Sequence, residues 1–279
     1  MKTVSFFGHE VTRLILGDNP FNGHSYIQDE ISGEEMKTYY TQEKILETLF
    51  EAESLGLNTI MPLACPKMLE VLTEYRNKGG VMKIIFQPYP AEPVEENLEK
   101  MLNHKPIAIY HQGTTTDYLN ETDQAKVIKK NIEIYKSAGI PVGLGSHVPE
   151  TILQAETEDW GADFYVTCLY NARKNHRFEQ SGFITGKSKA DLIFYPEDRF
   201  LMYEVIKKIS KPCIVYKIFA GGQIFSGKPE AQHKSIAESM LREVYAGIKA
   251  NDIGAVGVFQ RDKKLLKLNV DLTEKITGY

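Results

Sequence analysis

Short β-rich apolar runs alternate with amphipathic stretches along the whole chain. In the amphipathic stretches apolar residues recur every three or four positions, as in Ala125, Ile128, Ile132 and Tyr135, which is the spacing of one helix face. Strands that alternate with helices in this way pair in parallel through right-handed crossovers. The apolar runs cover residues 14–16, 59–63, 83–87, 107–110, 142–144, 164–168, 213–217 and 255–259.

Eight strand–helix units predict an α/β fold that closes into a single (β/α)8 TIM barrel. The alternation continues without a linker, so we expect residues 1–279 to form one domain. The competing fold is a doubly wound open sheet. No glycine-rich phosphate-binding sequence follows the first apolar run, which favours the barrel.

Composition narrows the class of protein. No run of about 18 apolar residues occurs, and the N-terminus lacks the pattern of a secretory signal, so we expect no membrane span and a cytoplasmic location. The three cysteines are odd in number and far apart, which is typical of reduced thiols. A formal net charge of −4 argues against nucleic acid as the main partner.

Polar and titratable residues gather where the predicted strands end. Active sites of such barrels lie at the C-terminal mouth, so these residues are the candidate site, and a small-molecule substrate is the expected partner. The residues expected to bind that substrate are Asp18, Asn19, His24, Gln87, Tyr89, Tyr170, Asn171 and Arg173.

Two predicted loops at the mouth are longer than simple connections, at residues 18–42 and 172–194. Loops of this length are commonly lids or binding loops. The second loop carries basic residues that suit an anionic or polyhydroxylated ligand, although a solvated surface is the simpler interpretation. These residues are Arg173, Lys174, Arg177, Lys187 and Lys189.

Two histidines end neighbouring strands, His111 in the stretch IAIYHQG and His147 in LGSHVPE. Neutral imidazoles at adjacent strand ends suit acid–base catalysis near pH 7, or can share a divalent metal. Asp18 is the expected third metal ligand, with His24, Cys168 and Asp117 as other choices, but no HxH or HExxH spacing supports a metal. The alternative is two hydrogen-bonded structural histidines.

Lys217 ends an apolar strand, and partial desolvation there suits it to proton abstraction, Schiff-base formation or anchoring a substrate oxygen. A salt bridge in the barrel rim is the structural alternative. The predicted strand ends also carry three phenols, those of Tyr89, Tyr110 and Tyr170. Aromatic residues at such positions more often serve packing.

Several segments resemble the aldo-keto reductases. VSFFGHEVTRLILGDNPF is similar to that family's opening hairpin, AGIPVGLGSHVPETI to its fifth strand and turn, CLYNARK to its tyrosine–asparagine pair, and VYKIFAGGQI to its seventh strand. The resemblance implies an N-terminal β-hairpin at the barrel floor. The family's catalytic aspartate falls on Met61, its tyrosine near Pro66 and its lysine on Gln87. Only the catalytic histidine is kept, as His111.

The same resemblance implies a nicotinamide cofactor site. Tyr216 matches the aromatic residue on which the nicotinamide stacks, and Ser146, Thr167 and Asn171 fall at or beside positions that hold its carboxamide. Arg261 follows the eighth strand and suits the cofactor phosphate, but FQRDKKLLKLNVDL lacks the family's glycine-and-serine start. The resemblance therefore implies a divergent, reductase-like branch with replaced chemistry.

The resulting hypothesis is an enzyme that acts on a sugar-like or polyol-derived carbonyl compound. His111 and His147 exchange protons and Lys217 stabilises the developing negative oxygen, in lyase, isomerase or hydrolase chemistry, with or without a metal. One alternative is an NAD(P)H-dependent oxidoreductase with a rearranged proton donor. The other is a barrel that binds a ligand without chemistry.

Overall fold

The computed structural model describes residues 1–185 and 192–278, and in them eight parallel strands close into a barrel. Each strand pairs with its neighbours in parallel, in the order β10-β3-β4-β5-β6-β7-β8-β9. The last barrel strand in the sequence, β10, pairs with the first, β3, through Gly254–Val256 and Leu14–Leu16. The predicted (β/α)8 barrel is confirmed. The strands are β3 (Leu14–Gly17), β4 (Thr59–Met61), β5 (Lys83–Phe86), β6 (Ala108–His111), β7 (Val142–Ser146), β8 (Phe164–Cys168), β9 (Cys213–Tyr216) and β10 (Ile253–Val256).

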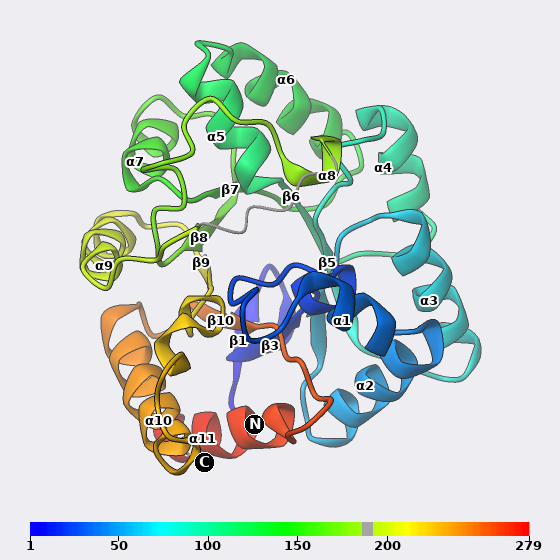
Figure 1. The fold of residues 1–279 in the computed structure, drawn as a ribbon. Coiled ribbons are helices and arrows are strands. Elements are labelled where there is room, and N and C mark those ends of the chain that lie inside the picture. The colour runs from blue at the N-terminus through cyan, green and yellow to red at the C-terminus, as the bar shows by residue number, and fades with distance from the viewer. Residues whose placement is uncertain (186–191, 279) are drawn as a thin grey trace.

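Helices surround the barrel (Figure 1). The outer helices are α2 (Gln42–Ser54), α3 (Pro66–Asn77), α4 (Val94–Leu102), α6 (Ala125–Lys136), α7 (Pro149–Thr157), α9 (Asp198–Lys208), α10 (Glu230–Gly247) and α11 (Leu265–Thr277). Further elements lie between the strand ends and these helices: η1 (Asn19–Asn22), α1 (Gly33–Tyr39), α5 (Gly113–Glu121), α8 (Gly182–Thr185) and η2 (Ala220–Phe225). Among residues 1–185 and 192–278, none of the helices combines the length and the hydropathy of a membrane span.

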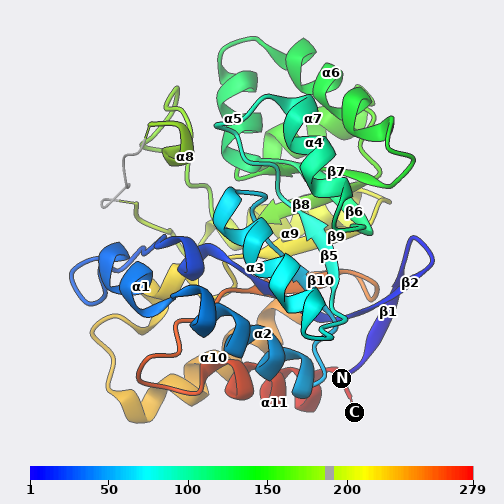
Figure 2. The same ribbon diagram turned by 90° about the vertical axis from the view of Figure 1, so that its right-hand side faces the viewer.

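An antiparallel hairpin of β1 (Thr3–Phe6) and β2 (His9–Thr12) covers one end of the barrel, as expected. Phe6 is buried, and its ring lies edge-on to the ring of Phe164 at 5.1 Å inside the barrel. The hairpin therefore seals the floor. Figure 2 shows it at the opposite end of the molecule from α8, which follows β8 on the mouth side.

Alternation along each strand divides the buried apolar residues into two cores. Side chains such as Ile15, Ile85 and Val166 fill the barrel, and Leu16, Ile84 and Tyr165 belong to the core between barrel and helices. Successive strand residues point to opposite faces, so one position decides which core a side chain joins.

This alternation corrects the prediction for His111. On β6, Ala108 and Tyr110 belong to the inner core, so His111 points outward toward the helices. Its Nδ1 lies 2.8 Å from Thr116 Oγ1, and Asn131 Nδ2 lies 3.2 Å from its Nε2. The Thr116 hydroxyl donates to the Gln112 carbonyl, so it accepts from Nδ1–H, and Asn131 donates to Nε2. His111 is a structural histidine that uses both ring nitrogens.

Burial holds His111 in its neutral form. Desolvation lowers its pKa from 6.5 to about 4, and the charge of Asp117 opposes this only in part. Between these values the unfolded chain binds a proton that the folded chain does not. Stability is thus complete above pH 6.5 and is lost as the pH falls toward the folded pKa, by about 3 kcal/mol for this group.

We predict that His111→Gln makes the free energy of unfolding less dependent on pH below pH 7. The free energy of unfolding of the wild type should fall between pH 7 and pH 5, and His111 should account for about 2 kcal/mol of that loss. Urea unfolding at the two pH values measures it. His233→Gln removes a half-buried imidazole on α10 and serves as the control. If the free energy of unfolding of His111→Gln fell with pH as steeply as that of the wild type, His111 would not be the buried neutral group.

Candidate active site

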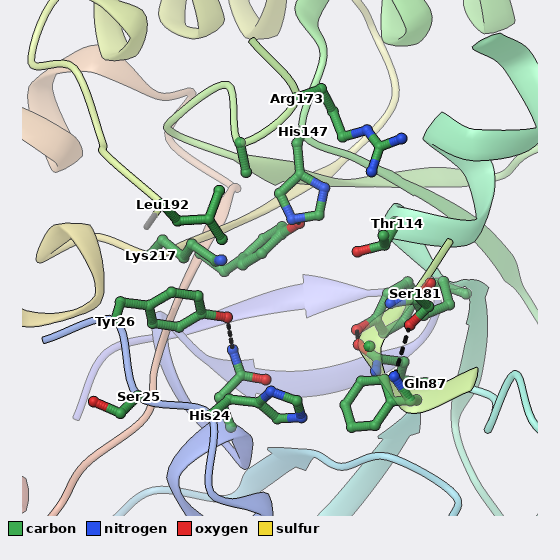
Figure 3. A pocket seen from close by; sticks show the side chains of 18 residues that line it. His24, Ser25, Tyr26, Gln87, Thr114, His147, Arg173, Ser181, Leu192 and Lys217 are labelled. Atoms are coloured by element: carbon green, nitrogen blue, oxygen red, sulfur yellow. Dashed lines mark hydrogen bonds between the residues drawn. The ribbon is translucent and has the colours of Figure 1, made fainter. Parts of the chain in front are cut away.

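A pocket opens at the mouth of the barrel, where the strands end (Figure 3). It encloses about 850 Å³ of empty space, with the open solvent at its entrance included. Side chains from the segments after β3, β5, β6, β7, β8 and β9 line it, so residues far apart in the sequence meet here. This is the mouth predicted from the strand–helix order.

A chain of hydrogen bonds runs from this pocket into the protein. The Tyr216 hydroxyl lies 3.0 Å from His147 Nε2, and His147 Nδ1 lies 2.7 Å from Asp117 Oδ2. Asp117 is fully buried and also accepts from the backbone N–H of His147 and the hydroxyl of Ser146, the latter at 2.6 Å. Tyr216 and His147 line the pocket, and Asp117 lies behind them.

The partners fix the protonation of the chain. Asp117 accepts every contact made to it here, so Nδ1 of His147 carries the proton and Nε2 accepts from the phenol. Burial lowers the pKa of His147, and the hydrogen bond to Asp117 opposes that shift. Burial also raises the pKa of Tyr216 well above its usual value. The resting state is a neutral phenol, a neutral imidazole and a carboxylate.

Two glycines allow the chain of hydrogen bonds to form. A Cβ at Gly145 in β7 would lie 3.0 Å from the Gly113 nitrogen and the His111 carbonyl, and a Cβ at Gly113 would lie 3.2 Å from the Tyr216 hydroxyl. Without these side chains α5 begins directly over the end of β7. One turn later the helix presents Asp117 to His147.

Lys217 lies beside Tyr216 in the same pocket. Consecutive strand residues point to opposite faces, but Lys217 has a left-handed backbone with φ +59°, which ends the strand and turns its side chain inward. Its Nζ lies 3.9 Å from the ring centre of Tyr26 and 4.9 Å from that of Phe194. Figure 3 shows Lys217, Tyr26 and His147 around the same space.

Gln223 joins the two long mouth loops through hydrogen bonds. Its Nε2 donates to the carbonyl oxygens of Tyr26 at 3.0 Å and Leu192 at 2.5 Å, and its Oε1 accepts from the Phe194 N–H at 3.0 Å. A Cβ at the neighbouring Gly221 would lie 2.5 Å from the Tyr26 ring. Described residues of both loops, such as Tyr26 and Leu192, thus line the pocket.

The pocket brings together four of the predicted substrate-binding residues: Asn19, His24, Gln87 and Arg173. Gln87 Oε1 accepts from the Tyr110 hydroxyl at 2.5 Å, so its amide nitrogen is the group left for a ligand. The pKa of His24 is lowered to about 4, first by burial and then by the charges of Lys217 and Lys37.

Four other predicted substrate-binding residues do not line the pocket: Asp18, Tyr89, Tyr170 and Asn171. Asp18 accepts from the Leu63 N–H and from Asn22, both at 2.7 Å, and burial raises its pKa to about 6. Tyr170 is buried against Arg199, and Asn171 Oδ1 accepts from the Arg173 N–H. These residues support the rim rather than face the cavity.

The described basic residues of the second loop each contact another side chain, and Arg173 pairs with Glu121. Lys174 pairs with Asp198, and Arg177 stacks on Phe178 at 5.2 Å. Neither lines the pocket, and Lys187 and Lys189 lie outside the described residues.

The predicted metal site is not formed. His111 points away from the mouth, and both ring nitrogens of His147 already have partners. Within residues 1–185 and 192–278, no three His, Cys, Asp or Glu side chains are grouped so that they could hold a metal ion. The proposal of His111, His147 and Asp18 as ligands is therefore wrong.

The predicted nicotinamide residues do not share a surface either. Arg261 pairs with Glu35 and Asp262 in a separate depression, and Ser146 binds Asp117. Thr167 is buried outside the pocket. Only Tyr216 of this set reaches the cavity, and there its hydroxyl binds His147.

Sequence reasoning missed the importance of three residues. Tyr216 was expected to stack on a cofactor, Asp117 to be at most a metal ligand, and Tyr26 had no role. A carboxylate one helical turn after the start of α5 was the available signal for Asp117, because α5 follows the strand next to His147.

No protein-family model and no curated protein matches the sequence. Solved structures match the fold. A truncated 3-deoxy-D-arabino-heptulosonate 7-phosphate synthase from Thermotoga maritima is 16% identical over 99% of this chain and 89% of its own, with a TM-score of 0.53. A phospho-2-dehydro-3-deoxyheptonate aldolase from the same organism is 17% identical over 99% and 70%, with a TM-score of 0.52.

Gox0644, of which a mutant has been solved with NADPH, is 13% identical over 100% of this chain and 89% of its own, with a TM-score of 0.59. None of these proteins is named as an aldo-keto reductase. The expected membership of an aldo-keto reductase-like family is therefore corrected: at these identities the likeness is one of barrel fold alone.

Proposed function

We propose that this protein is an enzyme that moves a proton to or from a small polar carbonyl compound at the mouth of the barrel. The observation that carries the proposal is the hydrogen-bonded chain Tyr216–His147–Asp117, whose phenol end opens into the pocket beside Lys217. A buried carboxylate that orients an imidazole, which in turn activates a hydroxyl, is the logic of general acid–base catalysis.

Each residue has a separate task in this mechanism. The Tyr216 oxygen takes a proton from the carbon next to the carbonyl while its own proton passes to His147 Nε2. Asp117 stabilises the imidazolium that forms, and Lys217 stabilises the negative charge that develops on the carbonyl oxygen. Return of the proton to the same carbon gives exchange, and its return to the neighbouring carbon of the enediol gives isomerisation. In a lyase reaction the same enolate instead expels a hydroxyl group from the next carbon as water, with the proton supplied by the His147 imidazolium through Tyr216.

The lining supports a sugar-like or polyol-derived substrate. Asn19, Gln87 and Thr114 present amide and hydroxyl groups to the cavity, and these groups hydrogen-bond well to substrate hydroxyls. The two Thermotoga maritima proteins of the same fold bear the names of a sugar-acid phosphate synthase and an aldolase. Bond chemistry next to a carbonyl is compatible with the mechanism proposed for this chain.

The backbone at Lys217 gives further support. A left-handed residue other than glycine costs about 1–2 kcal/mol, and such strain is concentrated at functional sites. Here the strain has an identifiable result, because it turns a second consecutive side chain into the pocket.

Deuterium exchange tests the proposed function without a known product. Purified protein in D2O is incubated with hydroxyaldehydes, hydroxyketones, sugars and their phosphates, and 1H NMR reports deuterium at the carbon next to the carbonyl. We expect the wild type to exchange at least one compound. Tyr216→Phe should slow that exchange by about a hundredfold or more, because the proton acceptor is lost.

Tyr170→Phe is the matched control, since it removes a buried hydroxyl that does not line the pocket. It should exchange at the wild-type rate. Equal exchange by Tyr216→Phe and the wild type would refute the role of the phenol. A compound that binds in calorimetry but never exchanges would favour the ligand-binding barrel instead.

A stability comparison tests the strain at Lys217. Lys217→Gly and Lys217→Ala both remove the side chain, but only glycine adopts φ +59° without steric cost. We expect the glycine variant to be more stable than the alanine variant by about 1 kcal/mol in urea unfolding, with exchange activity lost in both. An alanine variant as stable as the glycine variant would mean that the backbone is not strained.

A further inference from the structure

The described residues that line the pocket carry positive charge and no negative charge. Among its described lining residues there are two cations, Lys217 and Arg173, and neither an aspartate nor a glutamate. The chain as a whole carries a formal net charge of −4. The lining is thus opposite in sign to the rest of the protein.

The two cations differ in what neutralises them. Arg173 donates from Nε and Nη2 to the two oxygens of Glu121, at 3.0 Å and 2.5 Å, so its charge is paired inside the protein. Lys217 has no carboxylate partner among the described residues. The rings of Tyr26 and Phe194 attract its ammonium but carry no net charge to balance it.

The neighbouring histidines respond to this charge. Burial is the main reason that the pKa of His24 falls to about 4, and the charge of Lys217 is the second. Lys217 and Arg173 also act in the same direction on His147. Cavities with one sign of charge attract ligands of the opposite sign.

From these contacts we infer that the substrate is an anion, a small hydroxylated carbonyl compound whose carboxylate or phosphate group binds Lys217 Nζ. The inference rests on the proposed function, since it names the substrate class of the same pocket. An ammonium has three donors, so it can bind a charged group and the adjacent reacting oxygen together. The amide and hydroxyl groups of Asn19, Gln87 and Thr114 remain for the substrate hydroxyls.

Paired ligands test the charge requirement. Calorimetry compares dihydroxyacetone phosphate with dihydroxyacetone, and glycerate with glycerol, and inorganic phosphate and acetate serve as minimal anions. We expect the anion of at least one pair to bind at least tenfold more tightly than its neutral partner. The pair that shows the difference identifies the charged group as phosphate or carboxylate.

Variants of Lys217 show whether this residue causes the preference for the anion. Lys217→Met keeps the aliphatic chain without the charge and should abolish the preference for the anion, whereas Lys217→Arg should retain part of it. Lys228→Met removes an exposed cation outside the pocket and should behave as the wild type. Thermal melting of each variant shows that it is folded.

The outcomes separate the two proposals. Exchange of neutral carbonyl compounds that depends on Tyr216, together with equal binding of both members of every pair, would overturn the anionic substrate and leave the proposed function standing. An undiminished preference in folded Lys217→Met would also overturn it. Tight binding of an anion that depends on Lys217 but is never followed by exchange would instead count against the enzyme.

Discussion

The site depends on one buried carboxylate. Asp117 has no exposed surface, and it accepts from the ring and backbone of His147 and from Ser146. A buried charge is costly unless it is fully hydrogen-bonded, so these donors must stay in place for the fold to tolerate it. The requirement ties α5 to the end of β7 and fixes the His147 tautomer that faces Tyr216.

Backbone conformation adapts the barrel to this constraint. Gly145 and Gly113 leave the space in which α5 crosses the strand end, and the left-handed Lys217 adds a second side chain after Tyr216. A regular strand would supply only one of these two groups to the cavity. The two glycines and the left-handed Lys217 therefore lie where the proposed chemistry needs them.

The charge of the pocket is set by pairing rather than by composition. Glu121 neutralises Arg173 beside the cavity, and the uncharged rings of Tyr26 and Phe194 leave the charge of Lys217 unbalanced. The acidic chain thus contains a locally positive site. The same distinction explains why the basic residues of the loop after β8 are a poor guide to ligand binding, since Lys174 is already paired.

The barrel followed from the sequence, because strand and helix periodicity are local properties that parallel pairing and right-handed crossovers convert into one topology. The barrel topology also predicted that His147 and Lys217 lie at the mouth. Tertiary structure alone decided that His111 faces the helices and Tyr110 the barrel, since both faces of a buried parallel strand are apolar. It alone joined Asp117, His147 and Tyr216, because hydrogen bonds between distant segments depend on orientation, which residue spacing does not encode.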